Sequence, residues 1–239
     1  MRLLVTRPRD DAEAFAKLLR ARGHEATVAP VMEVHVIPGP PLPCEGVQAV
    51  LATSANGIRA LAQRTQRRDL TIYAVGPQTA EAARVAGFVP VINCDGDSVQ
   101  LVETVAREVD PKRGMLLHAA GAETAGRVRQ ALTARGFFVE TQVLYEALPV
   151  TQLAPVAKQA LADGSLDGVL MFSPRSAKTF ASLVDEAKLT QECARLVAFC
   201  ISSATVEALT PLTFARVAVA GTPNQDAILE LIPVPEPVR

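Results

Sequence analysis

Aromatic residues are scarce in this chain of 239 residues. Tryptophan is absent, and tyrosine occurs only at Tyr73 and Tyr145. The 24 basic and 25 acidic residues give a formal net charge of −1, and no basic stripe interleaved with aromatics occurs. The sequence therefore gives no support for a nucleic-acid-binding surface, and we expect no nucleic-acid partner.

Paired cysteines and spaced histidines are also lacking. The three histidines share no ligand spacing. The four cysteines form no C-x-x-C pair, and they are scattered over the chain at Cys44, Cys94, Cys193 and Cys200. This pattern excludes a disulfide framework and a zinc site, and we expect reduced thiols and no metal.

Long apolar runs and nucleotide motifs are missing. The N-terminus MRLLVTRPRD lacks the apolar length of a signal peptide, and no run approaches a membrane span. G-x-G-x-x-G and the Walker pattern do not occur. We therefore expect a soluble cytoplasmic protein that uses no cofactor and no membrane.

Short apolar runs alternating with helical patterns are what the sequence does contain, within a hydrophobic content of 49%. Apolar strands that alternate with helices predict parallel sheets covered on both faces, which is the doubly wound α/β class. The expected strands are Leu3–Thr6, Ala26–Ala29, Val47–Ala52, Ile72–Val75, Val89–Ile92, Met115–His118, Val139–Tyr145, Gly168–Phe172, Val197–Ile201 and Val217–Ala220.

The two halves of the chain match each other. Arg22-Gly23 corresponds to Arg135-Gly136, and Glu33 corresponds to Glu146. The turn TSANGIRAL, which contains Ser54, parallels FSPRSAKTF, which contains Ser173. Thr79 parallels Thr205 further along. Matched positions in the same order predict a duplicated unit of roughly 115 residues.

Proline-rich breaks fall inside each repeat, at IPGPPLP and LPVTQLAP. Such extended segments are typical of connectors, so we expect interdomain linkers at 37–43 and 145–153. The chain would then cross over between domains. The first α/β domain would be discontinuous, comprising 1–36 plus 154–239, and the second would comprise 44–144. Two connectors that run side by side predict a hinge.

The stretch IYAVGPQTAEAARVAG is the most informative local pattern. A strand ends at Gly76, a helix begins directly, and Thr79 lies in its first turn. Free amides at such a turn favour anions, although a capped helix without a ligand is an alternative reading. The pattern recurs at FCISSATVEAL, with Ser202 and Thr205.

Other strand–turn–helix junctions carry similar small polar groups. Ligands of open α/β sheets bind at the carboxyl ends of the strands, so these turns are candidate ligand contacts. Helix capping, or a solvated surface arginine, is the alternative role for each of them. The substrate-binding candidates are Thr6, Arg7, Ser54, Asn56, Gly76, Thr79, Ser173, Ser176, Ser202 and Thr205.

The order of these segments resembles the uroporphyrinogen-III synthase family. The segments that carry the resemblance are VTRP, the Ser54/Asn56 turn, AVGPQTAEAA, LYEALP, FSPRSA and SATVEAL. The resemblance implies two flavodoxin-like domains joined by a two-stranded linker, one of them discontinuous. It also implies cyclisation of hydroxymethylbilane with inversion of its last ring and loss of water.

The same resemblance places a tyrosine near the second linker, so Tyr145 is our candidate proton donor. A surface role, in which its ring plugs a domain edge, is the alternative. We expect a monomer; transient contact with hydroxymethylbilane synthase is a further hypothesis. The chain departs from the family pattern at Ser202, where glycine is usual, and at His118, where an arginine is common.

Two readings from other classes compete with the cyclase. A non-catalytic two-domain sensor or carrier of an anionic metabolite would use the same hinge and amide-rich turns. A nucleotide-sugar or phosphate enzyme would share the fold class alone, and its motifs are missing.

Overall fold

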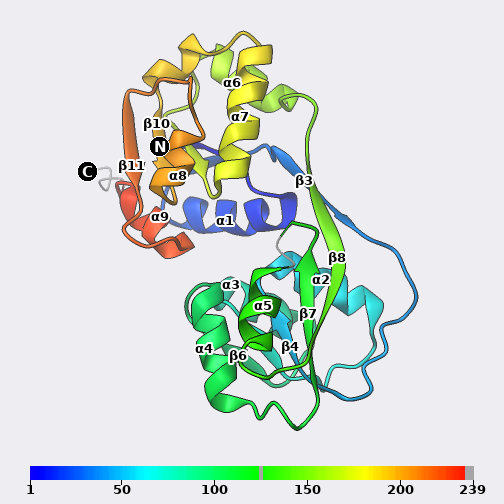
Figure 1. The fold of residues 1–239 in the computed structure, drawn as a ribbon. Helices are drawn as coiled ribbons and strands as arrows, with labels where there is room; N and C mark the ends of the chain where they lie inside the picture. The colour runs from blue at the N-terminus through cyan, green and yellow to red at the C-terminus, as the bar shows by residue number, and fades with distance from the viewer. Residues whose placement is uncertain (124–125, 235–239) are drawn as a thin grey trace. The chain divides into compact units, whose positions relative to one another are not determined.

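The computed structural model describes residues 1–123 and 126–234, which form two compact units (Figure 1). Unit 1 comprises Met1–Glu33 and Leu148–Arg239, described up to residue 234, and unit 2 comprises Val34–Ala147. Each unit is built on its own sheet with helices packed against it, and both sheets are parallel apart from strand β3 at one edge of the unit 2 sheet. The doubly wound α/β class is therefore confirmed.

Unit 1 contains a five-stranded parallel sheet in the order β11-β10-β9-β1-β2. Taken in chain order, this is the 2-1-3-4-5 arrangement of flavodoxin. Its strands are β1 (Arg2–Val5), β2 (Glu25–Val28), β9 (Gly168–Met171), β10 (Val197–Cys200) and β11 (Arg216–Val219). Its helices are α1 (Arg9–Ala21), α6 (Pro155–Ala162), α7 (Pro174–Glu186), α8 (Ser203–Glu207), α9 (Gln225–Leu231) and the 3₁₀ turn η1 (Gln191–Arg195).

Unit 2 is built on a sheet with the order β3-β8-β7-β4-β5-β6. Strands β8 to β6 are parallel along this order. The strands are β3 (Met32–Val36), β4 (Val47–Ala52), β5 (Ile72–Ala74), β6 (Val91–Asn93), β7 (Met115–Gly121) and β8 (Val139–Pro149). The helices are α2 (Ala55–Arg64), α3 (Pro77–Val85), α4 (Ser98–Glu108) and α5 (Arg127–Thr133).

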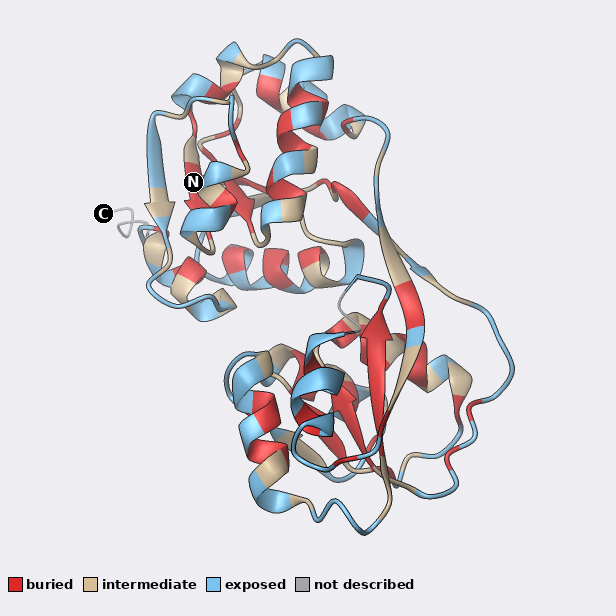
Figure 2. Ribbon diagram, viewed as in Figure 1, coloured by how far each residue is buried: buried red, intermediate tan, exposed pale blue. Residues whose placement is uncertain are grey.

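Buried apolar side chains form a separate layer on each face of the unit 2 sheet. Figure 2 shows that the central strands of this sheet consist largely of buried residues. Ile58 and Leu61 of α2 pack on one face, and Leu101 of α4 and Leu132 of α5 pack on the other. The helices are amphipathic, which is why each buries one stripe and exposes the rest. Two covered faces explain why the central strands are continuous apolar runs.

Strands β3 and β8 carry the chain between the units, because each contains a boundary of the two-unit division. The N–H of Ile37 donates to the carbonyl of Leu144 at 2.8 Å, and the N–H of Val150 donates to the carbonyl of Val31 at 3.1 Å. Residue numbers rise on one strand as they fall on the other, so the two strands are antiparallel. The linker is therefore two-stranded.

The two sheets have the same arrangement once the repeats are matched. Strands β9, β10 and β11 correspond to β4, β5 and β6, while β1 and β2 correspond to β7 and β8. The first part of each repeat joins the second part of the other, as in a domain swap within one chain. This exchange explains why unit 1 is discontinuous and why unit 2 reads 3-2-1-4-5 instead of 2-1-3-4-5.

One unit boundary differs from the proline-rich segment proposed as a linker, and the other falls inside the proposed segment. The division after Ala147 lies within 145–153, whereas the first division falls after Glu33 and residues 37–43 pack on unit 2. Arg64 holds this segment, because its guanidinium donates to the carbonyls of Pro40 at 2.8 Å and Ile37 at 3.2 Å. Leu42 is buried in the unit 2 core.

The ten expected strands are present, with small differences at their ends. β3 was not expected as a strand; its MEVHV pattern alternates buried or half-buried residues with exposed Glu33 and His35. That period of two is typical of a strand with one face in water. β8 also extends beyond Tyr145 to Pro149, through part of the segment expected to be a linker.

Candidate functional site

The candidate site of unit 2 lies where β4 and β7 end. These neighbouring strands lead to turns on opposite sides of the sheet, so they form its topological switch point, where open α/β sheets bind ligands. Ser54 follows β4 and caps α2, since its hydroxyl accepts the N–H of Gly57 at 3.1 Å. The Tyr145 hydroxyl lies 2.7 Å from the Ser54 hydroxyl oxygen.

Two glycines allow this arrangement. A Cβ on Gly121 would lie 2.6 Å from Tyr145 Cζ, so the ring packs directly against bare backbone. A Cβ on Gly57 would lie 2.6 Å from the Ala119 carbonyl oxygen, so α2 also approaches β7 closely. The sequence interpretation missed both residues. A glycine at the end of an apolar strand, as in His118-Ala-Ala-Gly121, was the available signal for close approach.

Gly76 and Thr79 lie on the neighbouring strand–helix junction. Ala52 of β4 pairs with Ala74 of β5, so their following turns leave the sheet at the same level. Gly76 is the N-cap residue of α3 and supplies no side-chain cap. The Thr79 side chain is buried, and its hydroxyl has no hydrogen-bond partner in the described part of the chain. This turn therefore keeps polar capacity for an anion.

Asn56 differs from its neighbours, because its side-chain oxygen accepts a hydrogen bond from Arg59 at 2.7 Å. That contact lies within the first turns of α2 and holds the amide on the helix. Its assignment as a ligand contact stays a prediction.

In unit 1, β1 and β9 form the switch point, and the side chains of Thr6 and Arg7 are occupied there. The Thr6 hydroxyl is fully buried and donates to the Leu170 carbonyl at 2.8 Å, which ties β1 to β9. Arg7 donates to Gln225 at 2.8 Å and Asp11 at 3.2 Å, and its guanidinium lies 4.5 Å from the centre of the Phe172 ring. The carboxylate of Asp11 already balances its charge.

The remaining unit 1 hydroxyls pair with one another. Ser173 caps α7 by accepting the Ser176 N–H at 3.1 Å, and its hydroxyl donates to Ser176 Oγ at 2.9 Å. Ser202 accepts the Thr205 N–H at 3.4 Å, and the two hydroxyls lie 3.0 Å apart. The capping role that the sequence offered as the alternative is thus present at both turns.

Ser202 stands in the position that corresponds to Gly76, and the two backbones have the same shape. Ser202 has φ −162° and ψ 165°, and Gly76 has φ −162° and ψ 179°. Extended backbone of this kind suits any residue. Serine at position 202 therefore adds no backbone strain. Its side chain caps the start of α8, whereas Gly76 has no side chain to cap α3.

His118 is fully buried on β7, and neither ring nitrogen has a hydrogen-bond partner among the described residues. Burial lowers the pKa of His118 from 6.5 to about 4, so the ring is neutral at physiological pH. Since Leu117 and Ala119 belong to the core layer of α2, alternation along the strand places His118 on the opposite face. The buried, neutral His118 ring therefore does not supply the positive charge of the arginine that is common at this position in the family.

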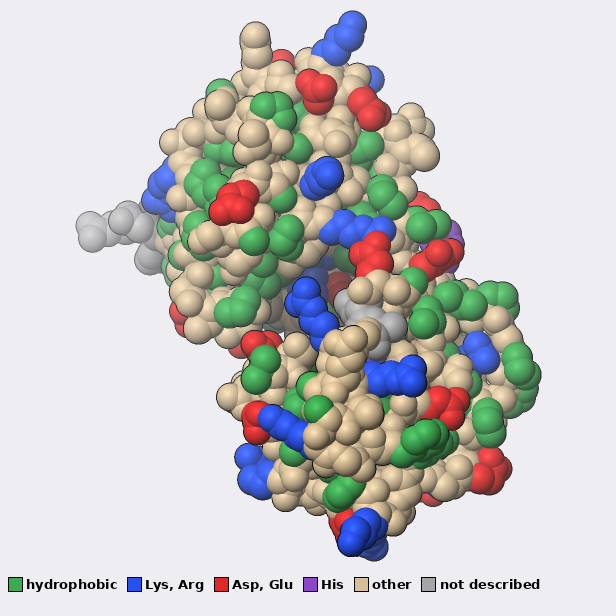
Figure 3. All heavy atoms as spheres, viewed as in Figure 1, with side chains coloured by type: hydrophobic (Ala, Val, Ile, Leu, Met, Phe, Trp, Pro, Cys, Tyr) green, Lys and Arg blue, Asp and Glu red, His purple; other side chains and the backbone are tan. Residues whose placement is uncertain are grey.

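Residues 1–123 and 126–234 contain no group of three or more His, Cys, Asp or Glu side chains placed to hold a metal ion. Over the same ranges, no helix has the length and apolarity needed to cross a membrane. On the face shown in Figure 3, basic and acidic side chains are interspersed.

The family model described as "Uroporphyrinogen-III synthase HemD" matches residues 13–230 of the chain. The chain belongs to the uroporphyrinogen-III synthase family. A curated uroporphyrinogen-III synthase from Chlorobaculum parvum is 24% identical over 203 residues, which cover 79% of this chain and 81% of that protein. Members of the family are cyclising lyases of haem biosynthesis.

Solved structures of uroporphyrinogen-III synthases share the fold. The enzyme from Helicobacter pylori superposes with a TM-score of 0.60 at 16% identity, covering 97% of this chain and 98% of its own. A mutant enzyme from Thermus thermophilus superposes with a TM-score of 0.50 at 21% identity, covering 96% of each chain. At these identities the likeness concerns the fold alone.

Proposed function

We propose that this chain is a uroporphyrinogen-III synthase in which Tyr145 acts as the proton donor. The reaction closes hydroxymethylbilane, inverts ring D, releases water and yields uroporphyrinogen III. The observation that carries the proposal is the 2.7 Å pairing of the Tyr145 and Ser54 hydroxyls at the switch point of unit 2, inside the family-matched segment.

Proton donation would act on the first step. The bond between the terminal carbon and its hydroxyl breaks with both electrons going to oxygen, which takes the Tyr145 proton and leaves as water. The product is an electrophilic azafulvenium cation, which keeps its pyrrole N–H, beside the Tyr145 phenolate. A placed general acid contributes about 10²–10⁴-fold to such a step. After ring D attacks through its substituted carbon, the bond from that carbon to the ring C methylene breaks. The unsubstituted α-carbon of ring D then bonds to that methylene, and the proton that it loses restores the phenol.

Ser54 is suited to orient the Tyr145 hydroxyl. Its oxygen already accepts the Gly57 N–H, which fixes its position at the start of α2. The same oxygen lies within hydrogen-bond distance of the phenol. A donor whose partner is fixed loses less freedom when the substrate binds, and this favours a single orientation of the proton.

The substrate carboxylates would be bound by turn amides and hydroxyls. Gly76 and Thr79 are the best supported, because α3 lacks a side-chain cap and the Thr79 hydroxyl has no hydrogen-bond partner among the described residues. Amides at a helix start favour negative charge. We keep the other named turn residues as substrate contacts through their backbone, including those whose side chains pair internally.

Folding of the flexible bilane would account for selectivity. Ring D must attack through its substituted carbon, and the unassisted intermediate closes to the symmetric type I isomer instead. Holding the reacting atoms in the productive geometry is an orientation effect. It explains how a site without paired carboxylates or a nucleophile–base pair directs the reaction.

An isomer assay tests the proposal. Purified protein is incubated with hydroxymethylbilane, and the oxidised products are separated by chromatography. We expect an excess of type III over type I, and a reduced rate with Tyr145→Phe. Formation of the type I isomer alone would contradict the cyclase. If X-ray scattering also showed that the domains close when a ligand binds, the protein would instead be the sensor or carrier.

Three further properties belong to this proposal. We propose that the protein works in the cytoplasm as a monomer. Light scattering at several protein concentrations tests the oligomeric state. A transient contact with hydroxymethylbilane synthase would deliver the unstable bilane. Faster coupled turnover than the two separate rates allow would support that contact.

A further inference from the structure

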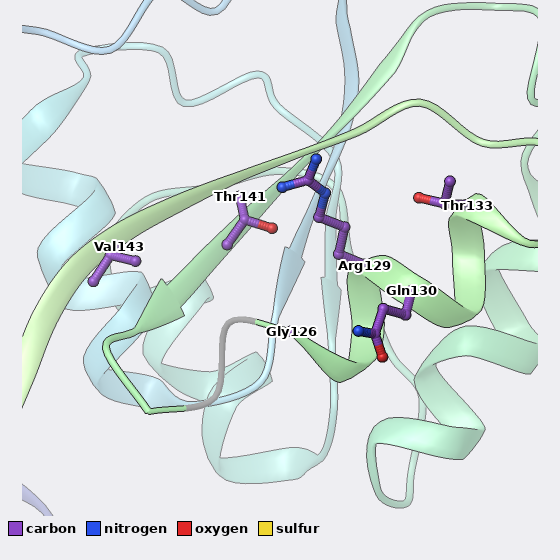
Figure 4. Close-up of a pocket in the computed structure, with 6 residues that line it drawn as sticks. All are labelled: Gly126, Arg129, Gln130, Thr133, Thr141 and Val143. Atoms are coloured by element: carbon purple, nitrogen blue, oxygen red, sulfur yellow. The ribbon is translucent and has the colours of Figure 1, made fainter.

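A groove separates α5 from β8 on unit 2 (Figure 4). Its volume is about 650 Å³, within the range of about 300–1,000 Å³ common for small-molecule sites. The lining residues come from α5 and its N-cap residue and from β8: Gly126, Arg129, Gln130, Thr133, Thr141 and Val143. Figure 4 shows Arg129 extending toward Thr141.

The wall of the groove contains polar atoms without partners. Thr141 Oγ1 is buried and has no hydrogen-bond partner among the described residues. Its register partner on β7 is His118, whose two ring nitrogens are also buried without a described partner. Most buried polar atoms in native proteins are paired, so this cluster retains unused hydrogen-bonding capacity beside the groove.

The charge of the lining is positive. Arg129 makes no hydrogen bond or ion pair within the described ranges, and none of the six lining residues is acidic. Side chains alternate along a strand, so Glu140 and Gln142 point away from the face that carries Thr141. Those two bond each other at 2.6 Å. The groove therefore offers one cation, hydroxyl and amide groups, and the apolar surface of Val143.

We propose that the groove between α5 and β8 binds a small organic anion, whose oxyanion group pairs with Arg129 and whose body packs on Val143 and Thr141. The oxyanion is a carboxylate or a phosphate, both of which guanidinium groups bind well. This site is separate from the Tyr145 site, because Tyr145 belongs to the core layer of α2, on the other face of the sheet.

Nuclear magnetic resonance titration of the full chain tests the proposal. The probes are propionate and inorganic phosphate, with sodium chloride at matched ionic strength as the salt control. We expect saturable shifts at the Thr141 amide, the Val143 methyls and the Arg129 Nε–H with at least one probe. The tighter probe identifies the oxyanion. Shifts that neither probe saturates, or that chloride reproduces, would overturn the proposal.

Two matched variants locate the charge. Arg129→Gln removes the lining cation, and affinity should fall about tenfold or more, as expected for a hydrogen bond to a charged group. Arg127→Gln removes a cation from the same short helix that does not line the groove, and affinity should stay within twofold. Equal losses in both variants would show general charge attraction and would contradict a site.

Thr141→Val tests the hydroxyl. The ligand-free variant should melt at a higher temperature, because a buried hydroxyl without a partner is removed from an otherwise similar shape. The increase in melting temperature that the tighter probe produces should be smaller than in the parent chain. An unchanged increase would contradict a role for Thr141 in binding.

Discussion

Substituting Gly121 by alanine tests the position of Tyr145 with the smallest possible change. The new Cβ would lie 2.6 Å from Tyr145 Cζ, 2.8 Å from its hydroxyl oxygen and 3.0 Å from Cε2. Favourable carbon contacts need about 3.5–4.0 Å, so the ring must retreat by about 1 Å. Gly121 is not among the glycines with positive φ, so alanine adds no backbone strain.

The displacement of the Tyr145 ring should break its hydrogen bond with Ser54. The Tyr145 and Ser54 hydroxyls lie 2.7 Å apart, and a displacement of about 1 Å along their line takes them beyond normal hydrogen-bond distance. A misplacement of this size costs about 10²-fold in rate. Overpacking should also cost about 1–3 kcal/mol of stability.

The assay is the initial rate of type III formation, with the melting temperature measured in parallel. Gly221→Ala is the matched control, because nothing lies within 4 Å of its added Cβ. We expect the control to keep the parental rate. A Gly121→Ala protein that is folded and fully active would refute the proposal that the Tyr145 position determines turnover. Loss of activity in this variant alone, with Tyr145→Phe unaffected, would move the role from the phenol to another group.

Three other substitutions or conditions give further expected outcomes. Tyr145→Phe should lower kcat by about 10²–10⁴-fold while costing about 1 kcal/mol of stability, measured by single-turnover kinetics and thermal melting. Gly76→Ser should raise KM severalfold and change stability by only a few tenths of a kcal/mol, because Ser202 adopts the same extended backbone in the equivalent turn. Burial lowers the pKa of His118 to about 4, so the imidazole of the unfolded chain is protonated at a higher pH than that of the folded chain. The free energy of unfolding should therefore be highest above pH 6.5 and should fall by about 3 kcal/mol as the pH drops to 4. Denaturant titrations at several pH values should show this contribution in the parent and not in His118→Leu.

The fold could be predicted because local and global signals agree. Buried parallel strands were visible as apolar runs, and Gly23 and Gly136 ended the first helix of each repeat with positive φ, at 79° and 87°. The first linker boundary could not be predicted, since proline content shows that a segment is extended but not what it packs on. The contacts of Arg64 with Ile37 and Pro40, together with the burial of Leu42 in the core, place that segment on unit 2.

The site was less predictable than the fold. Sequence patterns identify turns, but they do not show which hydroxyls are already used. Thr6 is committed to the Leu170 carbonyl, whereas Thr79 has no described partner, although both follow a strand end. The Tyr145–Ser54 pair joins residues far apart in sequence. It depends on Gly121, whose signal in the sequence was its place at the end of an apolar strand.

Comparison of the two halves of the duplication argues that the chemistry belongs to unit 2. Glu33 matches Glu146, so the residue equivalent to Tyr145 is Met32, which has no proton to donate and whose sulfur accepts the hydroxyl of Thr179. Ser173 is equivalent to Ser54, but its hydroxyl donates to Ser176. The hydroxyls of the matched turn thus pair with each other in unit 1, whereas in unit 2 the Ser54 hydroxyl pairs with Tyr145. Among the described residues, unit 2 holds the proposed proton donor Tyr145 and the α3 turn without a side-chain cap, and the matched positions of unit 1 hold Met32 and the capping Ser202. The proposed cyclase treats one end of its substrate differently from the other, and this asymmetry agrees with that proposal.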